Sequence, residues 1–208
     1  MEKSPVKWQV MPAGVIEAKA ALRRQLAGVL CSDWSPMVEA FLALPEVKQA
    51  RTVMIFYGAK ADEPDTRFLT EELLRRGKTV ALPRCMPGRE MQARAITAQS
   101  ILITGKFGIP EPGEDLTLVD KSEINLILVP NLCCDEDGFR LGRGGGYYDR
   151  FLKDFTGVSV ALCPQERLVG ALPTESTDVP VDIVLTQTQI RRRAGAPRRI
   201  REESAAIK

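Results

Sequence analysis

The sequence contains no histidine among its 208 residues. This absence excludes a Ser-His-Asp triad, a Cys-His dyad and any imidazole metal site or proton shuttle, because each of them needs that ring. No apolar run approaches the roughly 20 residues that a membrane-spanning helix requires. The N-terminal segment also lacks the apolar core of a secretory signal. We therefore expect a cytoplasmic protein without a membrane partner, whose chemistry rests on carboxylates, lysine, arginine, tyrosine, backbone amides and an oxygen-ligated cation.

Cysteine is sparse: the chain has five, at irregular spacing and without a Cys-x-x-Cys pair. Neither a disulfide framework nor a zinc site is indicated. Cys133 and Cys134 are adjacent, so in a strand their side chains would point to opposite faces. A redox pair is one interpretation of these thiols, and small buried apolar residues are the favoured one.

The net charge of +2 is unevenly distributed along the chain. Residues 191–208 hold seven basic and two acidic residues, which gives this segment +5 and the remainder −3. We expect residues 1–190 to form a single α/β catalytic domain, and residues 191–208 to form a basic, poorly ordered tail. An arginine-rich end can bind nucleic acid, but the acidic body does not favour such a partner. We expect a monomer rather than an oligomer.

Alternating helix and strand patterns predict an α/β fold. The strand–helix–strand order within 52–83 is a βαβ unit, which favours a parallel sheet. Residues 124–130 form an apolar run interrupted only by Asn125, as expected of a central buried strand, and 108–113 is predicted to be a loop. Strands are expected at residues 52–57, 79–83, 91–96, 124–130, 158–163 and 182–186. Helices are expected at residues 15–30, 36–45, 66–76 and 146–155. The apolar positions that predict the first helix are Ile16, Ala20, Leu22, Leu26 and Leu30, and those that predict the third are Phe68, Leu69, Leu73 and Leu74.

The segment Gly142-Arg-Gly-Gly-Gly146 carries the strongest chemical signal. Four glycines in five positions let the backbone adopt positive φ and approach a ligand closely. The loop follows an apolar strand and precedes a helical pattern, so free N–H groups at a helix start would suit a phosphate. Arg140 and Arg143 add fork-shaped cations that match phosphate oxygens. A tight structural turn is the alternative, but the arginines favour a phosphate-binding loop in a nucleotide-using enzyme.

The helical pattern after this loop predicts different environments for its two tyrosines. Tyr148, Phe151, Leu152 and Phe155 recur at helical spacing and form one apolar stripe. Tyr148 should therefore enter the core, which leaves Tyr147 free to face the pocket.

The residues around the loop indicate a protein family more specifically than its glycines do. Val129-Pro-Asn-Leu-Cys-Cys-Asp135 followed by Gly138-Phe-Arg-Leu-Gly-Arg-Gly-Gly-Gly-Tyr-Tyr-Asp-Arg-Phe-Leu152 closely resembles the signature of the 5-formyltetrahydrofolate cyclo-ligase family. The resemblance extends over about residues 15–187, through Lys19-Ala-Ala-Leu-Arg23, Glu63, Gly108-Ile-Pro-Glu-Pro112 and Asp178-Val-Pro-Val-Asp182. Asn131, Cys133-Cys134 and Thr177 depart from the family pattern.

The resemblance implies an ATP- and Mg²⁺-dependent, irreversible closure of 5-formyltetrahydrofolate to 5,10-methenyltetrahydrofolate, with ADP and phosphate as products. ATP would phosphorylate the formyl oxygen, N10 would attack the resulting carbon, and phosphate would leave. Such a reaction is compatible with the absence of histidine, because phosphoryl transfer depends mainly on positioning and charge neutralisation. The implied fold is a three-layer α/β sandwich of the CoA-transferase-like type, with a largely parallel central sheet flanked by helices.

The resemblance also implies roles for individual residues. Lys19 and Arg143 would be catalytic. Asp149 and Asp178 would hold Mg²⁺ directly or through water, while Tyr57, Glu63 and Tyr147 would bind the folate, with Phe107 as a further stacking candidate. ATP would be bound by Lys19, Arg23, Arg140, Gly142, Arg143, Gly144, Gly145, Gly146, Tyr147 and Tyr148.

Each role has a structural alternative. Lys19 and Arg23 could form a solvated helix face, Glu63 could cap a helix, and Asp149 could interact only with a helix dipole. Asp178 and Asp182 could be turn formers, and we take Asp182 as structural. A non-catalytic regulator that binds folate or nucleotide on the same scaffold is the alternative function.

Overall fold

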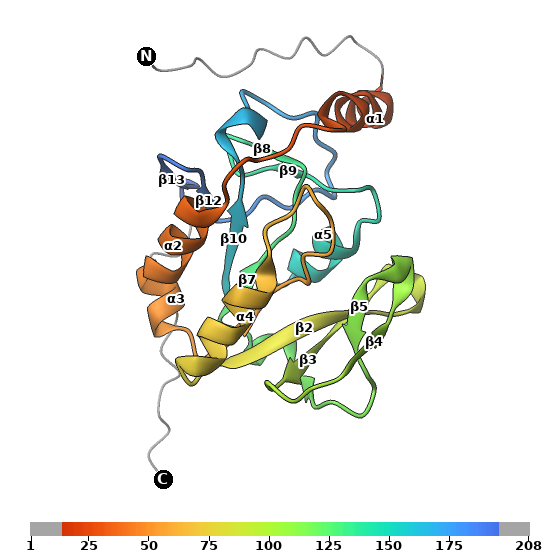
Figure 1. The fold of residues 1–208 in the computed structure, drawn as a ribbon. Helices are drawn as coiled ribbons and strands as arrows, with labels where there is room; N and C mark the ends of the chain where they lie inside the picture. The colour runs from red at the N-terminus through yellow and green to blue at the C-terminus, as the bar shows by residue number, and fades with distance from the viewer. Residues whose placement is uncertain (1–13, 196–208) are drawn as a thin grey trace.

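The computed structural model describes residues 14–195, and its centre is a mixed sheet of eight strands (Figure 1). The five central neighbours β12, β10, β7, β1 and β2 run parallel, and antiparallel pairs form at both edges. The buried run around residues 124–130 supplies β7, which lies in the middle of the sheet, as predicted. In spatial order the strands are β13 (Ile190–Arg192), β12 (Ile183–Leu185), β10 (Val158–Leu162), β7 (Leu126–Leu128), β1 (Thr52–Met54), β2 (Thr79–Cys85), β3 (Met91–Ile96) and β6 (Leu118–Val119).

Helices cover both faces of this sheet. Alternate residues of each strand point to opposite faces, so Val53 joins one core cluster with α2, α3 and α4, while Met54 joins another with α5. The expected three-layer α/β sandwich with a largely parallel sheet is confirmed. The helices are α1 (Val15–Leu26), α2 (Ser35–Ala43), α3 (Pro45–Gln49), α4 (Thr66–Arg75) and α5 (Tyr147–Leu152), and none of those in the described chain is long and apolar enough to cross a membrane.

Several helix predictions need correction. α1 ends at Leu26 because Ala27 is extended and Gly28 has a φ of 83°. Its buried face is Ala18, Leu22 and Leu26, whereas the predicted stripe members Ile16 and Leu30 are exposed, as is Phe68 of α4. Pro45 does not merely end a helix, because it occupies the first turn of α3. α5 has six residues instead of the ten predicted for 146–155.

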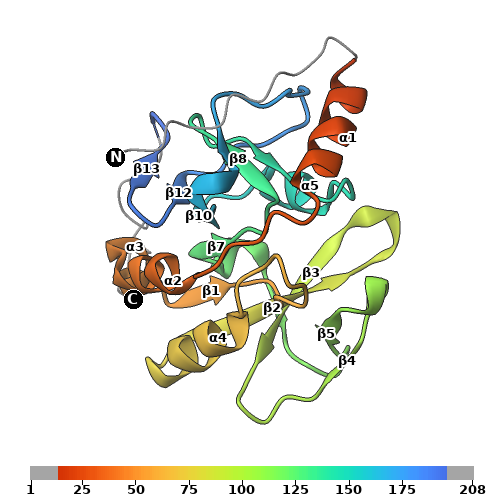
Figure 2. The same ribbon diagram turned by 45° about the horizontal axis from the view of Figure 1, so that its top comes forward.

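Two small sheets flank the main one. The first contains β8 (Cys133–Asp135), β9 (Arg140–Leu141) and β11 (Leu168–Val169), and it lies beside α1 (Figure 2). The second is a ribbon of β4 (Leu102–Thr104) and β5 (Pro110–Pro112). The prediction that 108–113 is a loop is therefore wrong. A two-stranded ribbon tolerates proline where its missing N–H would face away from the partner.

The chain does not leave the sheet at residue 190. Residues 190–192 form β13, which pairs antiparallel with β12, so the predicted last strand at 182–186 is followed by another. Arg192 Nη1 lies 2.5 Å from Oε1 of the buried Glu46, and Arg193 Nη2 lies 2.9 Å from Asp182 Oδ1. These ion pairs correct the expected tail boundary. Residues 196–208, on which the remaining tail prediction rests, lie outside the described chain.

Candidate functional site

The glycine loop connects β9 to α5. Gly144 and Gly146 have φ values of 96° and 67°, a region that side chains other than glycine rarely adopt. A Cβ built on Gly144 would lie 3.5 Å from Cζ of Arg23, which places the loop directly beside α1. Because α5 is short, its dipole is weaker than the predicted longer helix would provide. The cations around the loop must therefore contribute most of any affinity for phosphate.

Arg23 extends from α1 to this loop, and Lys19 of the same helix extends to the segment that carries Glu175 and Asp178. Lys19 Nζ lies 2.5 Å from Asp178 Oδ2 and 3.1 Å from Glu175 Oε2, and only 12% of its side chain is exposed. Arg23 Nε donates a hydrogen bond of 2.8 Å to the carbonyl oxygen of Gly142. The alternative that these residues form a solvated helix face is wrong.

Arg140 and Asp149 form a second ion pair at the base of the loop. Arg140 Nη1 lies 2.9 Å from Asp149 Oδ1, and 4% of the arginine side chain is exposed. The same carboxylate oxygen accepts a 3.2 Å hydrogen bond from the backbone N–H of Val179, the neighbour of Asp178. Asp149 thus does more than interact with the helix dipole. It joins α5 to the segment that carries Asp178, so the two predicted metal ligands lie on adjoining segments.

Residues 60–65, here called the acidic loop, form the opposite wall and present two carboxylates to Arg143. Arg143 Nη2 lies 2.7 Å from Asp62 Oδ1 and 3.2 Å from Glu63 Oε1. Asp65, not Glu63, caps α4, because its side chain accepts the backbone N–H of Arg67 at 3.0 Å. The helix-cap alternative for Glu63 is therefore wrong.

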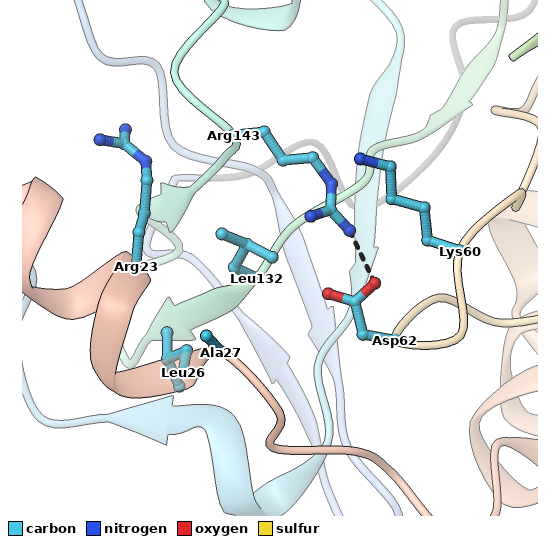
Figure 3. A pocket seen from close by; sticks show the side chains of 7 residues that line it. All are labelled: Arg23, Leu26, Ala27, Lys60, Asp62, Leu132 and Arg143. Carbon is cyan, nitrogen blue, oxygen red and sulfur yellow. Dashed lines mark hydrogen bonds and ion pairs between the residues drawn. The ribbon is translucent and has the colours of Figure 1, made fainter. Parts of the chain in front are cut away.

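These walls enclose a cavity of about 330 Å³ (Figure 3). Figure 3 shows Arg23 rising from α1 on one side and the Arg143–Asp62 pair on the other, with Lys60 beyond that pair. The cavity is lined by Arg23, Leu26, Ala27, Lys60, Asp62, Leu132 and Arg143. It is the kind of basic, open recess that a polyphosphate can enter.

The two tyrosines after the loop occupy different environments. Tyr148 packs against both core clusters, as predicted, and burial raises the pKa of its hydroxyl well above the usual range. Tyr147 is not free: it is 9% exposed, its hydroxyl accepts a 2.8 Å hydrogen bond from Lys106 Nζ, and its ring meets Phe107 edge-on at 6.3 Å. The turn between β4 and β5 therefore covers Tyr147. Tyr57, just after β1, is partly buried against the first core cluster.

Asn131, Cys133 and Cys134, which depart from the family pattern, are not among the residues that line the cavity. Cys133 packs with α1 residues, while Cys134 packs in the α5 core cluster, so the adjacent thiols face opposite sides. Burial raises the pKa of both thiols, which fits apolar packing and not a redox pair. Asn131 Nδ2 donates a 2.9 Å hydrogen bond to the carbonyl of Leu162 and links the ends of two strands.

Sequence reasoning missed three polar residues of the site. Lys60 and Asp62 line the cavity, and Glu175 binds Lys19 together with Asp178. Two of them had a local signal, because they lie in the acidic loop with Glu63. Among the described residues, no group of three or more acidic or cysteine side chains is arranged to hold a metal ion. A cation at Asp149 and Asp178 would need further oxygens from a ligand, as Mg²⁺ commonly does.

The chain is similar to known proteins in sequence and in fold. The sequence model of the 5-formyltetrahydrofolate cyclo-ligase family matches residues 16–187. An Escherichia coli K12 5-formyltetrahydrofolate cyclo-ligase is 33% identical over 155 residues, covering 72% of this chain and 85% of its own. A probable cyclo-ligase of Schizosaccharomyces pombe is 28% identical over 163 residues, covering 71% and 80% respectively. The solution structure of Aquifex aeolicus 5,10-methenyltetrahydrofolate synthetase shares 30% identity with a TM-score of 0.73, covering 84% of this chain and 92% of that one.

Proposed function

The chain belongs to the 5-formyltetrahydrofolate cyclo-ligase family, and from this premise we propose that it uses ATP to close 5-formyltetrahydrofolate to 5,10-methenyltetrahydrofolate, releasing ADP and phosphate. The observation that carries the proposal is the meeting of Arg23 from α1 with the glycine loop, where Arg23 and Arg143 line one cavity. Cations from two distant segments beside a loop with positive φ at Gly144 and Gly146 are suited to a polyphosphate. Lys19, on the same helix as Arg23, pairs with Asp178.

The chemical problem is the formyl oxygen, which is a poor leaving group. Its phosphorylation by ATP converts it into phosphate, so that attack by N10 on the formyl carbon can expel it and the N10 proton is lost to solvent. Lys19 and Arg143 would neutralise charge on the transferred phosphoryl group, while Arg23, Arg140 and the loop amides would bind the remaining phosphates. None of these tasks needs an imidazole, because they consist of positioning and electrostatic stabilisation.

The ion pairs suggest how binding would proceed. In the structure, Lys19 pairs with Asp178 and Arg140 pairs with Asp149. A triphosphate entering between them would replace each carboxylate as the partner of its cation. Asp149 and Asp178 would then be available to hold Mg²⁺, which would supply positive charge to stabilise the triphosphate. The chain thus fits Mg²⁺ as a cofactor that binds together with the nucleotide.

The folate would lie against the acidic loop and the tyrosines. Glu63, whose side chain is 11% exposed, can accept hydrogen bonds from the N–H edge of a pterin. Phe107, which is exposed and meets the covered Tyr147 ring edge-on, offers a face on which a flat ring can stack. Tyr57 follows β1, is partly buried against the first core cluster, and would contact the folate from that side. In this arrangement Arg143 lies between the two substrates, because it contacts Glu63 and also lines the cavity.

The alternative of a non-catalytic regulator loses its basis. It was suggested by the departures at Asn131, Cys133 and Cys134, and none of these three side chains is among those that line the cavity. Cytoplasmic location, a monomeric state and the lack of a nucleic-acid partner stay predictions.

The deciding experiment is a cyclisation assay on the purified protein. With Mg²⁺, ATP and 5-formyltetrahydrofolate, the near-ultraviolet absorbance of the methenyl product should rise only when ATP is present. Lys19→Met should lower kcat/KM for ATP at least roughly tenfold, because a cation at a phosphate is removed. Arg75→Ala, at an exposed position of α4, is the matched control and should retain full activity. No ATP-dependent signal, with a reference cyclo-ligase active in parallel, would refute the proposal.

A further inference from the structure

Arg167 is the largest side chain that is fully buried in the described chain, with 1% of it exposed. It ends the short 3₁₀ turn Gln165–Arg167 that follows β10. The ion pairs within residues 14–195 do not include it, so its charge is buried without a carboxylate partner. Burying an unpaired guanidinium opposes folding, and its Nε has no hydrogen-bond partner among these residues. Stability alone does not explain this residue.

The contacts of Arg167 lead to both walls of the nucleotide cavity. Nη1 donates a 2.9 Å hydrogen bond to the backbone carbonyl of Asp62, in the acidic loop. Nη2 donates to the backbone carbonyl of Val29, just beyond the end of α1. The guanidinium also lies over the ring of Trp34, with its Cζ 6.0 Å from the ring centroid. The planar guanidinium of Arg167 therefore fixes the separation between the link after α1 and the acidic loop.

This separation sets the width of the cavity. Leu26 and Ala27 line one side only three and two residues before Val29, and Asp62 itself lines the other side (Figure 3). The Asp62 side chain in turn holds Arg143 at 2.7 Å. A shift of either wall would thus move cations that must bind phosphates simultaneously. A displacement of about 1 Å is enough to break a phosphate contact, because a charge-assisted hydrogen bond is only about 2.7–2.9 Å long.

We propose that Arg167 is a positioning residue that holds the two walls of the nucleotide cavity at the spacing required by ATP, without touching ATP itself. The inference deepens the proposed function and rests on it for the identity of the nucleotide. It explains why a charged side chain is retained where an apolar one would be easier to bury. A guanidinium can donate to two carbonyls in one plane, whereas lysine offers a single point charge.

The test compares Arg167→Met and Arg167→Lys with a matched control. Arg94 also donates to two backbone carbonyls, those of Leu116 and Glu114 at 2.7 and 2.8 Å, but on β3, outside the cavity. Calorimetry would measure binding of Mg²⁺ with a non-hydrolysable ATP analogue, and thermal unfolding would be followed in parallel. We expect Arg167→Met to fold and to bind the analogue about tenfold more weakly, with Arg167→Lys intermediate. Arg94→Met should bind within about twofold of the unmodified protein.

Turnover then separates positioning from a structural role. Arg167→Met should raise KM for ATP about tenfold while kcat changes less than about threefold, because no group that meets the reacting atoms is removed. Unchanged analogue binding in Arg167→Met would overturn the inference, and so would loss of folding in both Arg167 variants. If the unmodified protein binds the analogue but does not cyclise folate, the proposed function fails, while the binding comparison still decides the role of Arg167.

Discussion

Replacing Gly144 with alanine tests the glycine loop, and Gly77 supplies a control with the same type of backbone. Both residues have positive φ, 96° and 72°, and neither added Cβ would approach another atom closer than 3.5 Å. Forcing alanine into this region costs about 1–2 kcal/mol in either place. For a chain of this length, that corresponds to a fall in Tm of roughly 2–8 °C. The two variants should therefore be destabilised to a similar extent.

The Gly144→Ala and Gly77→Ala variants should differ in activity. At position 144 the new methyl group would lie 3.5 Å from Cζ of Arg23, in the gap between the loop and α1, whereas at Gly77 it would enter open space. A phosphate oxygen bound by Arg23 must come within about 2.7–2.9 Å of its nitrogens, so the methyl group competes for the same volume. Loss of one charged hydrogen-bonding contact is worth about 1.5–3 kcal/mol. Since about 1.4 kcal/mol is a factor of ten, kcat/KM for ATP should fall roughly 10- to 100-fold for Gly144→Ala.

The assay follows methenyl formation at varied ATP concentration, with Tm measured on the same preparations. Gly77→Ala should keep the unmodified kcat/KM despite its lower Tm. If Gly144→Ala is fully active, phosphate does not approach the loop between Gly144 and Arg23. If both variants lose activity equally, the effect belongs to stability and the phosphate-binding interpretation of the loop is wrong.

Three further predictions concern the metal, the last strand and the thiols. Asp178→Asn should raise the Mg²⁺ concentration that gives half-maximal activity about tenfold, because a carboxylate ligand becomes a neutral amide; an unchanged Mg²⁺ titration would remove Asp178 from the metal site. Arg192→Ala leaves the buried carboxylate of Glu46 without its ion-pair partner. The free energy of unfolding measured in urea should fall by about 1–3 kcal/mol, because solvent at the partly exposed arginine screens part of the interaction. An unchanged urea midpoint would mean that this ion pair of β13 does not stabilise the protein. Cys134, whose thiol pKa is raised by burial, should react with iodoacetamide only after unfolding and far more slowly than the partly exposed Cys31; equal rates in the folded protein would contradict its burial.

The sheet was predictable where its signal is local. Apart from Asn125, residues 124–130 are apolar, which is typical of a strand covered on both faces, so the central position of β7 follows from the sequence. The βαβ unit over 52–85 was likewise encoded in hydrophobic periodicity. β5 was missed because the two prolines of 110–112 argue against a ladder. β13 was missed because its arginines suggest solvent, although Arg192 pairs with Glu46, 146 residues earlier.

The site was less accessible to local reasoning. Spacing alone favoured a solvated face for Lys19, and its pairing with Asp178 across 159 residues is a product of the tertiary fold. Only the family resemblance selected these two residues together. Glu175 was overlooked since nothing distinguishes it from a surface carboxylate until Lys19 is placed beside it. The burial of Arg167 could not be predicted from the sequence, because an arginine in a short loop is ordinarily exposed.

The attachment of α1 has a consequence for how the protein responds to its substrate. This helix supplies Lys19 and Arg23, yet its own apolar anchorage consists of Leu22 and Leu26 against Cys133 and Leu141. Burial of two leucines contributes on the order of 3–6 kcal/mol, and a helix of twelve residues is marginal by itself in water. The amide protons of α1 should consequently exchange with deuterium faster than those of β7 and β10. Saturating ATP, by binding only the docked helix, should slow that exchange selectively, so that the substrate completes the folding of its own binding site.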